Sequence, residues 1–206
     1  MIVEKYKNYF WKGMFLDDVI KYFNFTKYLE LGIANFETWN NVTCDLKMGV
    51  DLNPSVQGVN IINCSTSDFF NQNKEIFDLV FIDACHEKFH VKQDFFNSIA
   101  HSKDDAIIVM HDVYPPSASN AAKNGSSGDA FEFWMTLVDY YPDNTHVCLG
   151  EHMDCVGIFT KKDTEIDEKH FNNAPTERGY QYFIDNLDKY ILSRHNPYKF
   201  IGENFG

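Results

Sequence analysis

Short runs of apolar residues, each ending near a polar residue, dominate the first half of the sequence. These runs are Lys27–Gly32, Lys47–Asp51, Val59–Cys64, Phe77–Asp83 and Ala106–Asp112. Uninterrupted apolar runs of this length are typical of strands in a parallel sheet that is buried on both faces. Between the last two runs, the segment His86–His101 places apolar residues at helical spacing. We therefore expect a right-handed strand–helix–strand unit there.

Helical patterns flank these runs. Aromatic residues recur at helical spacing from Lys5 to Asn24, which predicts one or two amphipathic helices packed on the core. A loop rich in Pro, Ser, Asn and Gly spans Val113–Gly128, and we expect it to be mobile and to lie beside a site. Asp129 is expected to cap a helix over Ala130–Tyr141, and a final helix is expected over Glu177–Leu192.

Two further strands are expected at Thr145–Leu149 and Cys155–Thr160, and their short connection predicts an antiparallel pair at one edge. The pattern as a whole predicts a doubly wound, Rossmann-like α/β sheet of about seven strands. It should be mostly parallel with one antiparallel edge strand, and helices should cover both faces. We divide the chain into an N-terminal helical segment (1–26), a core (27–162) and a C-terminal helical extension (163–206) that packs on the core.

Composition narrows the class of partner. The 206 residues suit one domain, and 30 acidic against 18 basic residues give a formal net charge of −12. Such a chain repels phosphate backbones, so we expect no nucleic-acid partner. The sequence contains no long apolar stretch and no apolar leader, so we expect no membrane partner. The 5 cysteines form no CxxC pair, which favours a reducing, cytoplasmic location.

Acidic and imidazole side chains gather where the predicted strands end. Ligands of open α/β sheets bind at the carboxyl ends of the strands. The polar residues and the glycine at or just after these ends are Glu30, Gly32, Asp51, Asp68, Asp83, His86, His111 and Asp112. No lysine or arginine is among them, and the turn after the first strand lacks the glycine patterns of phosphate-binding loops. Carboxylates suit a cationic ligand with ribose hydroxyls and no phosphate, and S-adenosylmethionine has these properties.

The same residues carry a family resemblance. The segments Glu30–Gly32, Gly49–Asp51 and Ser65–Phe70 resemble successive cofactor motifs of class I S-adenosylmethionine-dependent methyltransferases. The segments Phe77–His86 and Ile108–Asp112 resemble the Methyltransf_24-like subgroup of small methyltransferases, which is found among glycan and secondary-metabolite genes. The likeness covers about residues 27 to 160 and also includes Gly128–Phe131 and Cys155–Ile158.

The resemblance implies roles for individual residues. Glu30 and Gly32 would line the methionine part of the cofactor, and Asp51 would accept hydrogen bonds from the ribose hydroxyls. Asp68 would lie near the adenine amino group, and Asp83 would face the methyl-transfer centre. The sequence departs from the family at Phe36, where relatives usually have a second glycine, so cofactor binding is expected to be altered or weak.

Asp83, His86, His111 and Asp112 follow two strands that should be neighbours. Two imidazoles and two carboxylates can act as base and orienting group for a hydroxyl acceptor. They can equally hold a divalent metal, magnesium or manganese, through Asp83, His111 and Asp112. Val113 stands where catechol-type relatives have a further ligand, which favours the metal-free interpretation.

The residues and the resemblance together predict a methyltransferase that acts on a hydroxyl of a small-molecule acceptor, with a sugar as the first candidate from the family setting. The alternative is a non-catalytic binding module on the same fold, which the substitution at Phe36 favours. The sequence leaves open whether the chain is a monomer or a homodimer.

Overall fold

The computed structural model describes residues 12–53, 55–149, 155–172 and 178–194. Within these ranges seven strands form one sheet in the order β3-β2-β1-β4-β5-β7-β6. The strands are β1 Lys27–Leu31, β2 Leu46–Asp51, β3 Ile61–Asn63, β4 Phe77–Ile82, β5 Ser102–Met110, β6 Thr145–Leu149 and β7 Cys155–Thr160. The first five are parallel, whereas β7 runs antiparallel to both β5 and β6. The predicted Rossmann-like sheet is confirmed, and its one antiparallel strand lies just inside edge strand β6.

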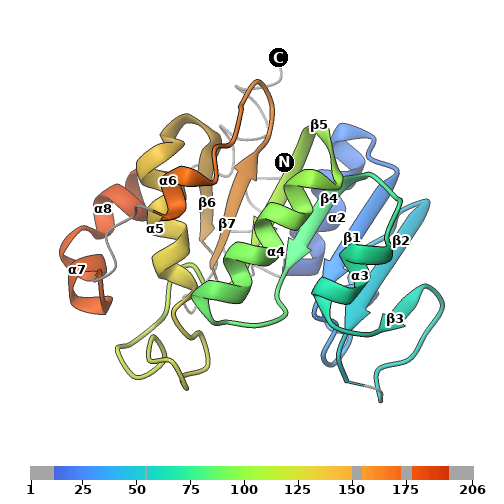
Figure 1. Cartoon of the computed structure of the whole chain (residues 1–206), viewed down its shortest axis with the longest axis horizontal. Coiled ribbons are helices and arrows are strands. Elements are labelled where there is room, and N and C mark those ends of the chain that lie inside the picture. Colours follow the sequence, from blue (N-terminus) through green and yellow to red (C-terminus); the bar gives the residue numbers. More distant parts are fainter. Residues whose placement is uncertain (1–11, 54, 150–154, 173–177, 195–206) are drawn as a thin grey trace.

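Helices pack on both faces of the sheet (Figure 1). The α-helices are α2 Lys12–Phe23, α3 Thr66–Gln72, α4 Lys88–Ala100, α5 Ala130–Tyr140, α6 Lys169–Asn172, α7 Tyr180–Asp185 and α8 Leu187–Tyr190. Short 3₁₀ turns are η1 Trp39–Asn41, η2 Pro142–Asn144 and η4 Leu192–Arg194. None of the helices in the described ranges has the length and apolar character needed to cross a membrane. The predicted beginning of the first helix, residues 5–11, lies outside these ranges.

Strand β4 shows why the sheet is buried on both sides. Its side chains alternate, so that Leu79 and Phe81 join a core with α2 while Val80 and Ile82 join a core with α3, α4 and α5. Every residue of β4 is buried. Burial of each large apolar side chain contributes about 1.5–3 kcal/mol relative to exposure, so this fully buried strand fixes the centre of the fold.

The connection from β1 to β2 contains the turn η1 instead of a long helix. Helix α2 packs closely on this turn at Gly13, because a glycine has no side chain to keep the two segments apart. A Cβ at this position would lie 2.6 Å from Asn41 Cβ. The N-terminal helix thereby approaches the loop that follows β1. This contact brings the start of α2 to the carboxyl ends of the strands.

Two local expectations were wrong. Asp129 precedes α5 without capping it, since its carboxylate instead accepts a hydrogen bond from the backbone N–H of Lys88 at the start of α4. The helix predicted to end at Leu192 is broken at Asn186 into α7 and α8. The break lets Phe183 and Tyr190 both turn into the core, where each is fully buried.

Backbone pairing continues past the strand ends and places the polar residues side by side. Gly32 N donates to Val50 O at 2.8 Å, Asp83 N to Leu31 O at 2.8 Å, and His111 N to Ile82 O at 3.0 Å. The residues after β1, β4 and β5 therefore meet at one edge of the sheet, at the lower side of Figure 1 beside the loop 113–128. This is the edge where parallel α/β sheets bind ligands.

Gly32 is the position where this arrangement requires glycine. Its φ is +89°, and a Cβ there would lie 2.2 Å from the carbonyl oxygen of Asp83. We predict that Gly32→Ala lowers the free energy of unfolding by about 2 kcal/mol or more, because positive φ and the clash with a neighbouring peptide both oppose a side chain. Urea unfolding monitored by circular dichroism measures this loss.

The matched control is Gly179→Ala, since Gly179 has an ordinary φ of −66° and nothing within 4 Å of an added Cβ. It should change the unfolding free energy by less than about 0.5 kcal/mol. Equal stability of the two variants would contradict the proposed constraint at Gly32.

Candidate active site

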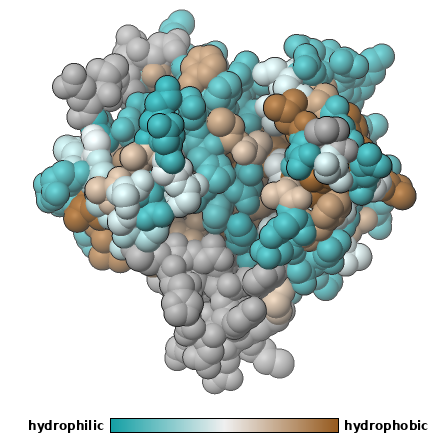
Figure 2. Space-filling view, turned by 90° about the horizontal axis from the view of Figure 1, so that it is seen from below, coloured by the Kyte–Doolittle hydropathy of each residue, from teal (hydrophilic) through white to brown (hydrophobic). Residues whose placement is uncertain are grey.

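The face at the carboxyl ends of the strands is largely hydrophilic at its centre (Figure 2). Two adjoining cavities open on this side of the sheet. The first has a volume of about 320 Å³, and the second a volume of about 750 Å³. Gly32 and Ala84 line both, so the two cavities meet where the loops after β1 and β4 touch.

The loop after β1 has the backbone of a glycine-rich turn without its glycines. Ala34 and Phe36 both have positive φ, +44° and +66°. Such a conformation costs a non-glycine residue roughly 1–2 kcal/mol. Phe36 packs beside Ile33, Trp39 and Val56 in a small apolar cluster, which offsets this strain. Phe36 therefore keeps the backbone shape that a glycine would give at this position.

Asp51 holds that loop in place. Its Oδ2 accepts hydrogen bonds from the backbone N–H groups of Ile33 and Ala34, at 2.8 and 3.0 Å. Its Oδ1 accepts from Asn53 N at 2.7 Å. Burial alone would raise the pKa of Asp51, but these three N–H donors outweigh it and lower the pKa, so the carboxylate stays ionised. Asp51 also lines the first cavity, where Oδ1, which accepts one hydrogen bond from the backbone, can accept a further one.

Glu30 is a buried acid at the end of β1, with a relative exposure of 1%. The hydroxyl of Tyr28 donates to its Oε2 at 2.8 Å, and Glu30 lines the second cavity. Burial raises its pKa to about 8, although the Tyr28 hydrogen bond opposes the shift. Glu30 is therefore mostly protonated at neutral pH in the absence of a ligand.

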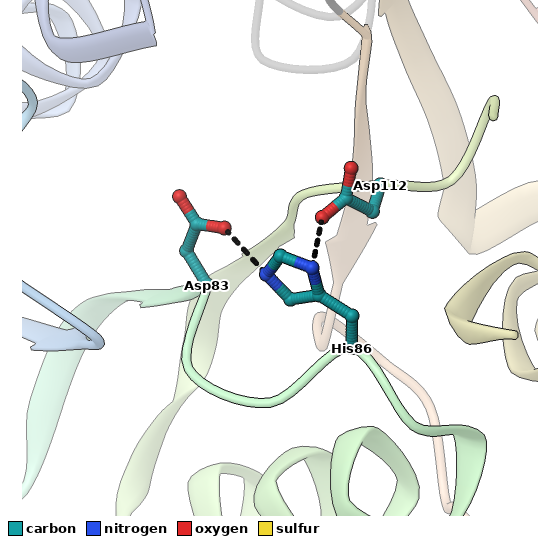
Figure 3. Close-up of side chains that lie close together, drawn as sticks. All are labelled: Asp83, His86 and Asp112. Atoms are coloured by element: carbon teal, nitrogen blue, oxygen red, sulfur yellow. Dashed lines mark ion pairs between the residues drawn. The ribbon is translucent and has the colours of Figure 1, made fainter. Parts of the chain in front are cut away.

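Asp83, His86, His111 and Asp112 form a compact cluster, as the sequence predicted. Figure 3 shows the His86 ring between the carboxylates of Asp83 and Asp112. Its Nε2 lies 3.7 Å from Asp83 Oδ1 and its Nδ1 lies 3.2 Å from Asp112 Oδ2. Asp112 has a φ of +57°, an unusual conformation for a residue other than glycine. Strain of this kind is concentrated at functional sites.

The two histidines differ in what surrounds their second nitrogen. His111 Nδ1 lies 3.1 Å from Asp83 Oδ1 and 3.2 Å from Asp112 Oδ2. His111 Nε2 lies 3.4 Å from the ammonium of Lys12, and both residues line the second cavity. Both nitrogens of His86, by contrast, face oxygen acceptors, because Nδ1 also lies 2.5 Å from the carbonyl oxygen of Ser126.

These surroundings favour a charged His86. The contact with Asp83 raises the pKa of His86, burial opposes the shift, and Asp112 and the Ser126 carbonyl add to it. Asp83 shows the complementary effect: burial would raise its pKa, but His111, His86 and Lys12 together hold the pKa well below its usual range.

Asp68 lies apart from both cavities. It is exposed at the start of α3, where its Oδ2 accepts from Ser65 Oγ at 2.7 Å and its backbone N–H donates to Ser65 Oγ at 3.1 Å. This reciprocal pair stabilises the beginning of the helix. Its predicted role at the adenine amino group stays a prediction.

The lining residues that the sequence did not predict include Lys12, Ser126 and Asp94. Lys12, at the start of α2, places its ammonium 3.2 Å from Asp83 Oδ2. Ser126 comes from the loop 113–128, which therefore does lie beside the site. Asp94, on the inner face of α4, lines the first cavity. A single charged residue at the start of a helix carries no signal of what the helix packs against, so sequence pattern could not identify Lys12, whereas Asp94 interrupts the apolar face of its helix.

Comparison with known proteins finds a family match over part of the chain. Residues 34–113 match the family model Methyltransf_24, a methyltransferase domain. A search of curated proteins found no match. The matched segment includes Asp51, Asp83, His86, His111 and Asp112.

Solved structures share the fold at low sequence identity. The cofactor-bound protein Rv0187 from MTB has a TM-score of 0.59 at 17% identity over 74% of this chain and 80% of that one. An O-methyltransferase from Bacillus cereus in complex with SAH has a TM-score of 0.55 at 15% identity, over 72% and 79%. The MycE methyltransferase from the mycinamycin biosynthetic pathway, in complex with Mg, SAH and mycinamycin VI, has a TM-score of 0.50 at 19% identity, over 73% and 50%.

The buried acid Glu30 generates a prediction about stability. Its pKa is higher in the folded chain, about 8, than the usual value of 4.5, so stability decreases as the pH rises from about 4.5 to 8. Glu30→Gln removes this penalty and keeps an acceptor for Tyr28. We expect the variant to be more stable than the wild type by on the order of a few kcal/mol at pH 8, and by little at pH 4.

Urea unfolding across this pH range measures the difference. Glu37→Gln is the control, because Glu37 is an exposed acid beside the same cavity. A pH-independent difference between Glu30→Gln and the wild type would contradict the proposed protonation of Glu30.

Proposed function

We propose that this chain, a methyltransferase of the S-adenosylmethionine-dependent class with a Methyltransf_24 domain, methylates a hydroxyl group of a small-molecule acceptor with His111 as general base. The observation that carries the proposal is the orientation of His111. Its Nδ1 faces two carboxylates and its Nε2 faces the larger cavity. A histidine oriented in this way by a carboxylate is arranged to remove a proton from a bound group.

Cofactor placement follows from the two cavities. The adenosine part fits the first cavity, where Asp51 Oδ1 can accept a hydrogen bond from a ribose hydroxyl. The exposed side chain of Leu52, which also lines this cavity, offers an apolar surface to the adenine ring. The methionine part passes Gly32 into the second cavity, where its ammonium can pair with Glu30.

The reaction is an in-line displacement. The acceptor oxygen forms a bond to the methyl carbon while the carbon–sulfur bond breaks, and the electron pair of that bond remains on sulfur. The hydroxyl proton goes to His111 Nε2, and Asp83 and Asp112 stabilise the resulting imidazolium. Alignment of oxygen, methyl and sulfur supplies much of the rate.

Lys12 constrains how the acceptor binds. Its ammonium lies 3.4 Å from His111 Nε2, so the acceptor hydroxyl must take over that place before proton transfer. The ammonium keeps its contact with Asp83 Oδ2 at 3.2 Å, where it remains close enough to stabilise negative charge on the acceptor oxygen. Polar side chains dominate the remaining lining, including Asn35, Thr38 and Asn53, which suits a hydroxyl-rich acceptor such as a sugar.

His86 has a positioning role in this proposal. With both ring nitrogens facing acceptors and a raised pKa, it is a weaker candidate for the base than His111. It holds the carboxylates of Asp83 and Asp112 toward the centre of the cluster. Its contact with the Ser126 carbonyl also ties the loop 113–128 to the cavity.

A divalent metal is the second candidate for activating the acceptor. Asp83, His86 and Asp112 each offer one ligand atom within 4.8 Å of the others, so the residues fit a metal in number and spacing. The predicted set had His111 in place of His86. A metal bound there would act as a Lewis acid toward the acceptor oxygen. The mixed nitrogen and oxygen ligands suit manganese better than magnesium, and the Lys12 ammonium beside Asp83 competes with either.

Asp51 provides a test of the cofactor. We expect S-adenosylhomocysteine to bind in the micromolar range, about −8 kcal/mol, and Asp51→Ala to weaken it by about 1.5–3 kcal/mol through loss of charged hydrogen bonds. Calorimetric titration measures both. The 2′-deoxy analogue of the ligand distinguishes a direct contact between Asp51 and the ribose from an effect of Asp51 on the loop after β1. Loss of the 2′-hydroxyl should weaken binding to the wild type and have little further effect in Asp51→Ala. An equal effect in both proteins would show that Asp51 acts only through the loop.

The base assignment predicts how turnover responds to substitution and pH. His111→Ala should lower kcat about 10²–10⁴-fold while the affinity for S-adenosylhomocysteine changes little. His86→Gln should cost less, because His86 only positions the cluster. Since a base must be neutral, wild-type turnover should increase with pH through the range near 6.5 or slightly above. Single-turnover methyl transfer to a panel of sugars and phenols provides the measurement.

Chelator-treated protein belongs in the same experiment. Full activity after chelation supports the histidine base. Loss of activity that manganese or magnesium restores supports the metal instead. A wild type that binds the cofactor but methylates no acceptor on the panel would favour the non-catalytic binding module.

A further inference from the structure

Asp94 is an unusual residue for the inside of this protein. It lies on the inner face of α4 beside Val91, Phe95 and Ser98, and its relative exposure is only 2%. Its Oδ2 has no hydrogen-bond partner among the residues that the structure describes. A buried carboxylate oxygen without a donor destabilises a fold. Such a group is therefore expected to have a role that the ligand-free chain does not fulfil.

The position of Asp94 indicates what that role is. Asp94 lines the cavity of about 320 Å³ together with Asp51, Leu52, Thr66 and His90. Asp51 comes from the end of β2, whereas Asp94 comes from the middle of α4, so the two acids reach the cavity from different layers of the fold. If Asp51 receives the ribose, Asp94 lies where the base attached to that ribose can reach.

The chemistry of the carboxyl matches one edge of adenine. Burial raises the pKa of Asp94 to about 6, although a hydrogen bond with the Thr66 side chain and the positive charge of His90 both act to lower it. Above about pH 6 the group is therefore mainly a carboxylate, which accepts hydrogen bonds and donates none. Adenine presents an amine donor beside a ring-nitrogen acceptor. Hypoxanthine presents a carbonyl oxygen in place of the amine and an N–H in place of the ring-nitrogen acceptor, so a carboxylate oxygen held against the 6-position would be repelled.

We propose that Asp94 selects the adenine of the cofactor by accepting a hydrogen bond from its exocyclic amine. This inference rests on the proposed function, since it assumes that the first cavity holds S-adenosylmethionine. It assigns to Asp94 the role that the family resemblance gave to Asp68, which is exposed, lies outside the cavity and already pairs with Ser65. Sites built around a buried acceptor reject analogues that lack the donor, because the acceptor is then left unpaired.

The experiment compares two ligands by calorimetric titration: S-adenosylhomocysteine and S-inosylhomocysteine, in which the amine is replaced by oxygen. The wild type should bind the adenosine ligand at least about tenfold more tightly. In Asp94→Ala the two affinities should become nearly equal. In Asp94→Asn the preference should also fall, because the amide can turn to present its N–H₂ to the hypoxanthine oxygen and its own oxygen to the ring N–H.

Two controls address position and structure. Ser98 lies one turn further along α4, is fully buried, and has a hydroxyl without a hydrogen-bond partner among the described residues. Unlike Asp94, it does not line the cavity, so Ser98→Ala is the matched control. It should leave the ligand preference unchanged. Thermal unfolding without ligand adds a second measurement: Asp94→Ala should melt no lower than the wild type, because it removes an unsatisfied buried group, whereas loss of a purely structural acid would lower the melting temperature.

The outcomes separate this inference from the cofactor assignment. If the wild type prefers the adenosine ligand and Asp94→Ala prefers it equally, Asp94 does not select adenine. If instead Asp68→Ala removes the preference, Asp68 performs the role. If the wild type does not bind S-adenosylhomocysteine at millimolar concentration, the cofactor assignment fails, and this inference fails with it.

Discussion

The contact between Gly32 and the Asp83 peptide determines the shape of the functional face. Strands β1 and β4 are parallel neighbours, so the residues that follow them emerge side by side. Because Gly32 has no side chain and a φ of +89°, its backbone can lie directly against the carbonyl of Asp83. Both cavities are lined by Gly32, and a side chain at this point would push the two loops apart. The connection between the two cavities therefore depends on this one close approach.

Charge is the second constraint on the site. Asp83 and Asp112 are both mostly buried and face the same point, and two carboxylates can be held together only if cations accompany them. The chain supplies these cations itself, through His86, whose pKa is raised, and through Lys12. These groups offset negative charge in the cluster of a protein whose net charge is −12. A metal ion bound by Asp83 would lie beside the Lys12 ammonium and would be repelled by its positive charge. A metal site lined only by oxygen ligands has no such neighbouring cation.

The sequence predicted those parts of the molecule that depend on local pattern. The strands β6 and β7 begin and end where they were expected, and the acids at the ends of β1, β2, β4 and β5 follow from the alternation of buried strands and polar loops. Parts that depend on tertiary packing were not predictable. Asp129 caps α4 instead of the helix that follows it, because the loop 113–128 folds back onto the start of α4.

The same limit explains why Lys12 and Asp94 were missed. Each lies on a helix whose pattern indicates only that one face is buried. Which loop of the sheet that face meets is decided by packing between segments distant in the sequence, as the 71 residues between Lys12 and Asp83 illustrate. A polar residue on the apolar face of a helix, such as Asp94, is the one local signal that could have been followed.

Asp51 and Asp94 show two different ways of placing an acid in a binding cavity. Asp51 is fully supported before any ligand arrives, since three backbone N–H groups donate to it, and its first task is to shape the loop that contains Phe36. That support explains how Phe36 can adopt a glycine-like φ of +66° without opening the loop. Asp94 has no comparable support at Oδ2 among the described residues. An acid that is already satisfied adds affinity by accepting further hydrogen bonds, whereas an unsatisfied buried acid adds discrimination, because only a ligand with a donor in the right place relieves its desolvation. A cavity with one acid of each kind can hold a ribose firmly and still distinguish between the bases attached to it.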